Sequence, residues 1–169
     1  MDNVEKGNEN KHKLNDTWTL WYHLPNDTNW NIDSYSIIDN VSYVEDAIAL
    51  NNEISNLLSK CMFFVMRKDI KPFWEFEKNR NGGSFSYKVS NDIVMEVWEK
   101  LYYLLIGETL TENKEIVKSI NGITISPKKM YCIIKIWMTS CEYKDSSIFK
   151  QLELLNNQVC IFKQHKPEY

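Results

Sequence analysis

The chain lacks several features that would place it in a common class of protein. No apolar run in its 169 residues approaches the roughly 20 residues of a membrane-spanning helix, and its polar N-terminus does not resemble a signal peptide. The four cysteines form no Cys-x-x-Cys pair and the three histidines are scattered, so no metal site is expected. The sequence has no P-loop, no carboxylate cluster suited to metals and no nucleophile–base arrangement. We therefore expect a protein that is not an enzyme, in particular not a nucleotide hydrolase, and that needs no cofactor.

The chain also lacks an excess of positive charge. Its formal net charge is −3, whereas proteins that bind nucleic acid mainly through phosphates are usually basic. Any contact with RNA should therefore be local and directed at one nucleotide. Apolar neighbours beside Cys61, Cys132 and Cys160 predict buried free thiols, which are typical of a reducing, cytoplasmic compartment.

The hydrophobic pattern predicts one α+β domain. With 43% hydrophobic and 13% aromatic residues, the chain can bury a sizeable core. Residues 1–13 are polar and predict a flexible N-terminal arm, which leaves 14–169 as the folded domain. Alternating or continuous apolar runs predict strands over 17–24, 61–66, 84–89, 119–125, 131–138 and 159–162. Apolar spacings of three and four predict helices over 44–58, from a cap at Asn91 or Asp92 to 106, and from a cap at Asp145 to about 155.

Two tryptophans stand outside these core patterns. Trp30 lies in a polar loop where no neighbour shares an apolar face with it, and Trp74 is followed at once by Glu75. An exposed indole is unfavourable unless something covers it. Two indoles and a carboxylate suit a flat, cationic base with N–H donors on its edge, such as 7-methylguanine, the head of the mRNA cap. The alternatives are core positions for the two indoles and a solvated charge for Glu75; Trp18, Trp21 and Trp98 are expected in the core.

Several sequence blocks resemble the eukaryotic translation initiation factor 4E family, whose members bind the mRNA cap. The blocks occur in the family's order over most of the chain: 12–22, 44–46, 72–79, 82–83, 105–108 and 136–139. The resemblance implies a strongly curved antiparallel sheet of about eight strands, with three helices on its convex face and the cap slot on its concave face. This agrees with the short turns between strands and the lack of βαβ order.

The resemblance also implies roles for individual residues. Trp30 and Trp74 would sandwich the methylated base, which combines stacking with attraction between the cation and the indole faces. Glu75 would accept hydrogen bonds from N1 and N2 of guanine. Trp137 would line the pocket for the methyl group, although its apolar strand equally predicts a core position.

The phosphate-binding part of the family pattern is only partly present. Lys128 matches a phosphate-binding position and Lys129 is its neighbour, although two lysines in a turn are often merely solvated. A position that is usually Arg holds Ser84, and two further basic positions match Met130 and Ile133. We therefore expect a weaker hold on the phosphates, or a greater contribution from nucleotides that follow the cap.

The surface that binds a scaffold protein in this family is altered as well. The matching positions are His12, Leu14, Val44, Ile48, Glu99, Lys100 and Tyr103. Ile48 replaces a Trp of the family, and Trp is a frequent hot spot of interfaces. Lys100 replaces an acidic residue, so an ordinary scaffold helix should bind weakly.

The sequence thus predicts a cap-binding subunit that brings capped mRNA to a scaffold initiation factor of the 4G type, or to a divergent equivalent. Outside that complex the protein is expected to be a monomer. A second hypothesis is a cap-binding repressor or specialised paralogue that does not use the ordinary scaffold. An interaction module that binds no cap is the third.

Overall fold

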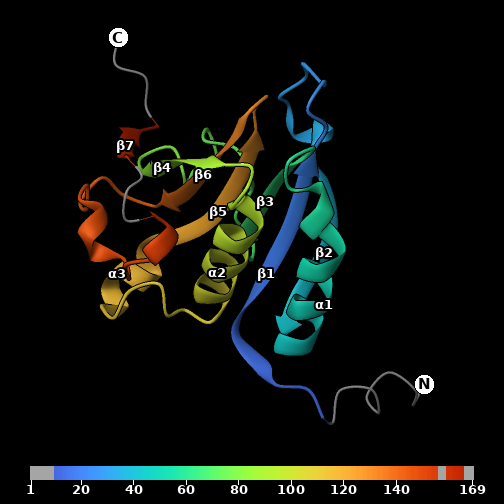
Figure 1. The fold of residues 1–169 in the computed structure, drawn as a ribbon. Helices are drawn as coiled ribbons and strands as arrows, with labels where there is room; N and C mark the ends of the chain where they lie inside the picture. Colours follow the sequence, from blue (N-terminus) through green and yellow to red (C-terminus); the bar gives the residue numbers. More distant parts are fainter. Residues whose placement is uncertain (1–9, 156–158, 166–169) are drawn as a thin grey trace.

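One curved antiparallel sheet organises the part of the chain that the computed structural model describes, residues 10–155 and 159–165 (Figure 1). Its strands follow one another in the order β2-β1-β3-β5-β6-β4-β7. Their bounds are β1 (Lys13–His23), β2 (Ser36–Tyr43), β3 (Met62–Arg67), β4 (Gly83–Ser90), β5 (Ile120–Pro127), β6 (Tyr131–Met138) and β7 (Cys160–Gln164). All neighbouring pairs are antiparallel.

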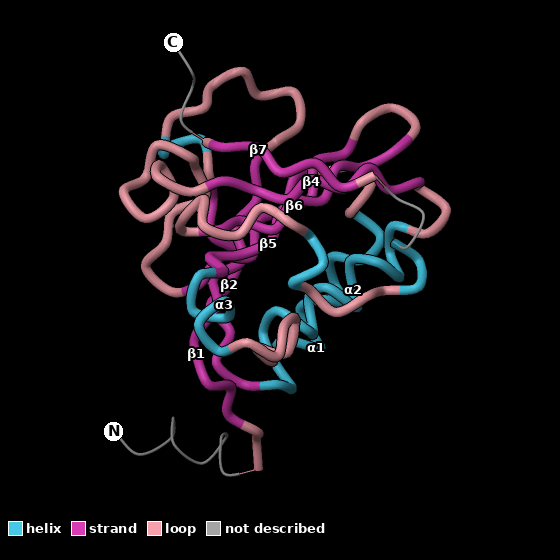
Figure 2. The backbone as a smooth tube through the Cα atoms, turned by 90° about the vertical axis from the view of Figure 1, so that its left-hand side faces the viewer, coloured by secondary structure: helices cyan, strands magenta, loops and turns pink. Residues whose placement is uncertain are grey.

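Helices cover one face of this sheet. They are α1 (Val44–Ile54), α2 (Val94–Ile106) and the short α3 (Lys114–Ser119). Figure 2 shows α1 and α2 together on one side of the strands. The longest helix of the described residues, α2, has 13 residues, fewer than the roughly 20 that a membrane span needs.

Side chains alternate along each strand, so one face of the sheet packs into the core beneath the helices and the other is the concave face. On β6, Ile134 and Ile136 point into the core beneath the helices, whereas Lys135 and Trp137 point to the opposite, concave face. The helices complete the core with large aromatic side chains, among them Tyr102 of α2, whose hydroxyl donates a hydrogen bond to the Ala47 carbonyl of α1 at 2.9 Å. The concave face is therefore the one that the helices leave free.

The predicted α+β fold, with a curved antiparallel sheet and three helices, is confirmed, and the described residues supply seven strands where about eight were expected. The prediction of a helix from Asp145 to about 155 is wrong. Two separate 3-10 turns lie there, Ser146–Ile148 and Glu153–Leu155. The backbone N–H of Lys150 instead donates to the Leu110 carbonyl at 2.8 Å, which holds this segment extended against the core.

The third α-helix lies earlier, at α3, where the sequence pattern is too short to show helical periodicity. Its cap is Asn113, whose side chain accepts hydrogen bonds from the backbone N–H groups of Glu115 and Ile116. Strand β2 was also missed, because as an edge strand it is largely exposed and does not alternate. The predicted cap of α2 is wrong too: α2 begins after Ile93 without a side-chain cap.

The boundary between arm and domain lies earlier than predicted. Lys13 already belongs to β1 and pairs with Tyr43. Lys11 forms an ion pair with Asp46 of α1 at 2.6 Å, so the folded part begins before residue 14. Residues 1–9 of the predicted arm lie outside the described part of the chain.

Arg67, at the end of β3, links three separate parts of the fold. Its guanidinium pairs with the carboxylates of Asp16 and Glu108 and donates to the carbonyls of Val117 and Ile120. It also lies over the Trp18 ring, 4.5 Å from the centroid. Only 17% of the Arg67 side chain is exposed, so these bonds are poorly screened by water.

We expect Arg67→Met to destabilise the protein by about 2–4 kcal/mol, because it leaves two partly buried carboxylates and two carbonyls without their partner. Arg67→Lys should cost less, since it keeps the charge but loses the planar fork of donors. Urea unfolding of both variants, with the exposed Arg80→Met as the control, measures the difference. Equal stability of the Arg67 and Arg80 variants would contradict this role.

Candidate functional site

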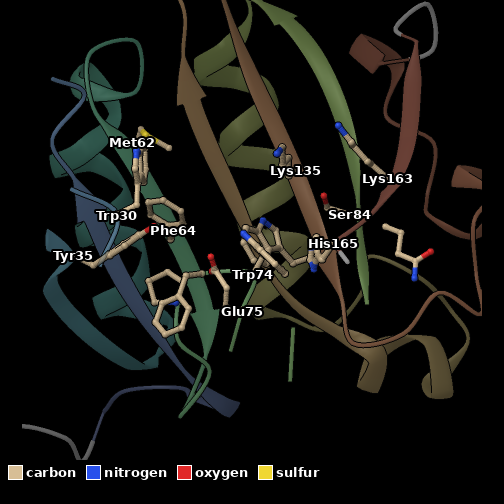
Figure 3. Close-up of a pocket in the computed structure, with 14 residues that line it drawn as sticks. Trp30, Tyr35, Met62, Phe64, Trp74, Glu75, Ser84, Lys135, Lys163 and His165 are labelled. Carbon is tan, nitrogen blue, oxygen red and sulfur yellow. The ribbon is translucent and has the colours of Figure 1, made fainter. Parts of the chain in front are cut away.

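A cavity of about 410 Å³ opens on the concave face of the sheet (Figure 3). Several segments far apart in the sequence contribute to it: the β1–β2 loop, the β3–β4 loop, and strands β3, β4, β6 and β7. The lining residues are Trp30, Tyr35, Met62, Phe64, Pro72, Phe73, Trp74, Glu75, Ser84, Lys135, Trp137, Lys163, Gln164 and His165. The cavity thus brings together all four residues predicted to contact the base: Trp30, Trp74, Glu75 and Trp137.

One face of the Trp30 indole packs against the protein, and the other is left open. The ring stacks on His23 with centroids 4.2 Å apart and an interplanar angle of 4°. His23 is buried at the end of β1, and its Nε2 donates a hydrogen bond to the Asn29 carbonyl at 2.8 Å, which ties the loop to the strand. Because 55% of Trp30 remains exposed, the indole keeps a large apolar surface for a ligand.

The loop that carries Trp74 and Glu75 is fixed by the buried side chain of Asn79. Its Nδ2 donates to the carbonyls of Lys71 at 2.8 Å and of Phe73 at 2.9 Å. Its Oδ1 accepts from Asn121 Nδ2 of β5 at 2.9 Å. The loop therefore has one defined position relative to the sheet, although Trp74 itself is 38% exposed.

Trp137 is both buried in the sheet and part of the cavity lining. Only 7% of it is exposed, and it packs with Phe64 and Met66 in a small apolar cluster on the concave face. Its Nε1–H donates to Thr124 Oγ1 at 3.1 Å, so the buried indole has its polar group satisfied. The same ring lines the cavity.

Tyr35 lines the same cavity, and the charge of Glu75 affects the pKa of its hydroxyl. Burial, and secondly the negative charge of Glu75, raise the pKa of the Tyr35 hydroxyl to about 12. Tyr35 is therefore a neutral hydrogen-bonding group at physiological pH. Glu75 itself is exposed at the cavity rim, where its oxygens can accept hydrogen bonds from a ligand.

The predicted phosphate residues lie apart from this cavity. Lys128 lines a neighbouring cavity of about 460 Å³, which continues along the concave face. Lys129 and Met130 are exposed in the β5–β6 turn, and Lys129 lines neither of these two cavities. Ser84 lies on β4 between Trp137 of β6 and Lys163 of β7, in direct register with both.

Sequence reasoning missed five polar residues of the cavity: Tyr35, Lys135, Lys163, Gln164 and His165. One signal was present, because Lys135 is the only charged residue in the apolar strand β6 and stands two positions before Trp137. It therefore had to face the same side of the sheet as Trp137. Lys163 and His165 gave no such signal, since only the pairing of β7 with β4 brings them to the cavity.

The predicted scaffold-protein surface lies on the helical side, away from the cavity. Ile48 of α1 is 42% exposed; Glu99 and Lys100 of α2 are exposed as well. Asn51, one turn after Ile48, donates to Glu99 at 3.3 Å, which joins the two helices. Lys100 pairs with Glu96 of its own helix at 2.8 Å.

The remaining predicted scaffold-surface residues are less accessible. Leu14 is buried, while Val44 and Tyr103 are partly buried. His12 is exposed, and its Nδ1 lies 2.6 Å from Glu45 Oε1 at the start of α1. This hydrogen bond lowers the pKa of the Glu45 carboxyl to about 2.

Within residues 10–155 and 159–165, no three His, Cys, Asp or Glu residues are grouped in a way that could hold a metal.

Known proteins resemble the chain over most of its length. A translation initiation factor 4E from Eremothecium gossypii is 33% identical over 138 residues, which cover 77% of this chain and 64% of that protein. One from Candida albicans is 28% identical over 181 aligned residues, which cover 98% of this chain and 84% of that protein. The chain thus spans less than two thirds of the Eremothecium protein.

Solved structures are similar as well. The crystal structure of a schistosome initiation factor 4E, complexed with m7GpppG and a 4E-binding protein, matches with a TM-score of 0.69 and 25% identity. The match covers 79% of this chain and 75% of that one. A family model described as eukaryotic initiation factor 4E matches residues 13–169. With its fold, its concave cavity and this match in agreement, the chain belongs to the eukaryotic initiation factor 4E family.

Proposed function

We propose that this protein binds the 7-methylguanosine cap of mRNA and brings capped mRNA to a scaffold protein for translation initiation. The observation that carries the proposal is the concave cavity, which brings Trp30, Trp74, Glu75 and Trp137 together from distant parts of the sequence. The schistosome relative was crystallised with a cap dinucleotide, which supports the same ligand class for this chain.

The chemistry of these side chains fits a methylated guanine. Methylation at N7 gives the base a delocalised positive charge, which an indole face attracts by about 0.5–2 kcal/mol. Stacking adds about 1–3 kcal/mol per base and is shared by unmethylated guanine. Trp30 and Trp74 supply such faces, so the difference between the two bases comes mainly from charge. A Glu75 carboxylate can accept from both N1–H and N2–H of guanine, a pair of donors that adenine lacks.

Nothing in this scheme requires a chemical step. The side chains of the cavity offer stacking surfaces, hydrogen-bond acceptors and ammonium groups, which bind and orient a ligand. We propose that the protein acts in the cytoplasm as a binding subunit rather than an enzyme. Incubation of a cap analogue with the protein and Mg²⁺ tests this, and turnover of the analogue would contradict it.

A second function, cap-dependent repression or a specialised role without the ordinary scaffold, is favoured by the exposed residues of α1 and α2. Two 4E-type proteins can bind the same cap and differ only in which partner they recruit. Here Ile48 presents an aliphatic side chain and Lys100 a cation on the surface that the family uses for its partner. Ile48 offers no indole against which a scaffold helix could pack, and Lys100 repels a basic residue of such a helix.

Replacing either indole should weaken cap binding without unfolding the protein. We expect Trp30→Ala and Trp74→Ala each to lose about 1–3 kcal/mol of binding free energy for a cap analogue. Both rings are substantially exposed, at 55% and 38%, so the melting temperature should change little. Fluorescence titration measures the affinity, and Leu24→Ala, an equally exposed apolar residue near Trp30, is the control. Wild-type affinity in the double Trp variant would refute the sandwich.

Replacing the Glu75 carboxylate should reduce discrimination for guanine. Glu75→Gln keeps the size of the side chain but turns one acceptor into a donor that faces a donor of the base. We expect a loss of about 1.5–3 kcal/mol, the usual worth of a hydrogen bond to a charged group. Glu77→Gln, two residues away and outside the cavity, should cost much less in the same titration. Equal losses in the two variants would mean that Glu75 does not contact the base.

The altered partner surface should bind an ordinary scaffold peptide weakly. Ile48→Trp together with Lys100→Glu is expected to strengthen binding of such a helical peptide at least tenfold, by adding aromatic area and removing charge repulsion. Cap affinity should stay unchanged. Lys100→Glu removes the exposed Lys100–Glu96 pair and puts two like charges in its place, and each of these effects costs only about 0.2–0.5 kcal/mol of stability. Calorimetric titration of the peptide, with Leu57→Trp as a control of similar exposure, measures the effect. Tight binding by the unmodified protein would contradict this interpretation.

A further inference from the structure

Two lysines face the concave groove beside the proposed base slot. Lys135 lies on β6 and Lys163 on the edge strand β7, and both line the same cavity as Trp74 and Glu75. In Figure 3 the two ammonium groups lie together on one side of the cavity, opposite Trp30 and Tyr35. They are therefore placed for the part of a ligand that extends away from the base.

Strand register explains why the two lysines are neighbours. Lys135 pairs with Ser86 on β4, and Lys163 pairs with Ser84 on the other side of the same strand. Residues two apart on β4 face the same side of the sheet, so the lysines are diagonal neighbours across that strand. The β5 residue beside Lys135 is Thr124. Small hydroxyl side chains thus surround the lysines and leave room above the sheet for a ligand.

The two positive charges have no carboxylate partner among the described residues. The ion pairs of the described chain are all formed elsewhere, by Lys11, His12, Arg67, Lys100 and Lys118. The only acidic residue that lines either cavity is Glu75, at the base end. Burial, and then the charges of Lys163 and Lys128, lower the pKa of Lys135. Like charges gathered without a counterion are unfavourable, so an anionic ligand would be stabilised here.

The groove continues beyond the two lysines. The neighbouring cavity shares Lys135 and Lys163 with the first and then extends along the sheet to Ile133, Ser126 and Lys128. A negatively charged chain that starts from a base near Glu75 would pass the lysine pair first and reach Lys128 afterwards. The polarity of the groove, one carboxylate followed by lysines, matches a cationic base joined to phosphates.

We propose that Lys135 and Lys163 together bind the phosphate chain that links the base of the cap to the next nucleotide. This inference rests on the proposed cap binding. The lysine pair gives the affinity that depends on phosphate number, whereas the slot formed by the aromatic side chains recognises the base. The bound chain neutralises both ammonium groups through charge-assisted hydrogen bonds.

The test compares ligands that differ only in their phosphates. Fluorescence titration of the full chain at two salt concentrations uses 7-methylguanosine, its 5′-monophosphate, its 5′-triphosphate and unmethylated GTP. The variant is the double change Lys135→Gln with Lys163→Gln. The control is Lys114→Gln with Lys118→Gln on α3, which alters the net charge equally and lies outside both cavities.

We expect the groove variant to lose roughly 10- to 100-fold in affinity for the methylated triphosphate, and most of its salt dependence. Its affinity for 7-methylguanosine should stay within about twofold of wild type, and the control should behave as wild type. The inference is overturned if the groove variant keeps the wild-type ratio between triphosphate and nucleoside, or loses both ligands equally. Failure of the unmodified protein to prefer the methylated triphosphate over GTP would instead overturn the proposed cap recognition, whatever the lysine variants do.

Discussion

The buried amide of Asn79 holds together the parts of the cavity that come from different regions of the chain. Its side chain donates to two carbonyls of the loop that carries Trp74 and accepts from Asn121 of β5. Its backbone carbonyl accepts from His165 Nδ1 at 2.8 Å, which adds the end of β7. One residue thus fixes the β3–β4 loop, β5 and the end of β7 relative to one another. A loop so exposed as that of Trp74 would otherwise have many conformations, and ordering it would weaken binding.

Close packing of the backbone supports the same arrangement. A Cβ atom at Gly82 would lie 1.8 Å from the Met138 carbonyl oxygen, so only glycine lets the β3–β4 loop return to β4 directly beside β6. A Cβ atom at Gly122 would lie 2.2 Å from the Val65 carbonyl oxygen. At these two glycines the backbone of the β3–β4 loop approaches β6 closely, and that of β5 approaches β3. The part of the cavity that lies on the sheet is therefore built on closely packed backbone.

The cavity on the concave face combines two kinds of side chain. Trp30 and Tyr35 lie on one side of it, and Lys135 and Lys163 on the other (Figure 3). The His165 ring packs beside that of Trp137, with the ring centroids 4.8 Å apart. Burial, and in part the charge of Lys135, lower the pKa of His165. A protein of net charge −3 can in this way bind an anionic ligand through a local group of lysines.

The sequence by itself determined six of the seven described strands and the two long helices, because these depend on local apolar periodicity. It also singled out Trp30, Trp74 and Glu75, because an indole in a polar loop and a carboxylate next to an indole are recognisable without neighbours. Short or exposed elements such as α3 and β2 were beyond local patterns. The tertiary structure alone decided the lysine pair, because Lys163 reaches the groove only through the register between β7 and β4. Apolar periodicity depends only on residues close together in the sequence, whereas the register between distant strands is fixed by the packing of the whole sheet.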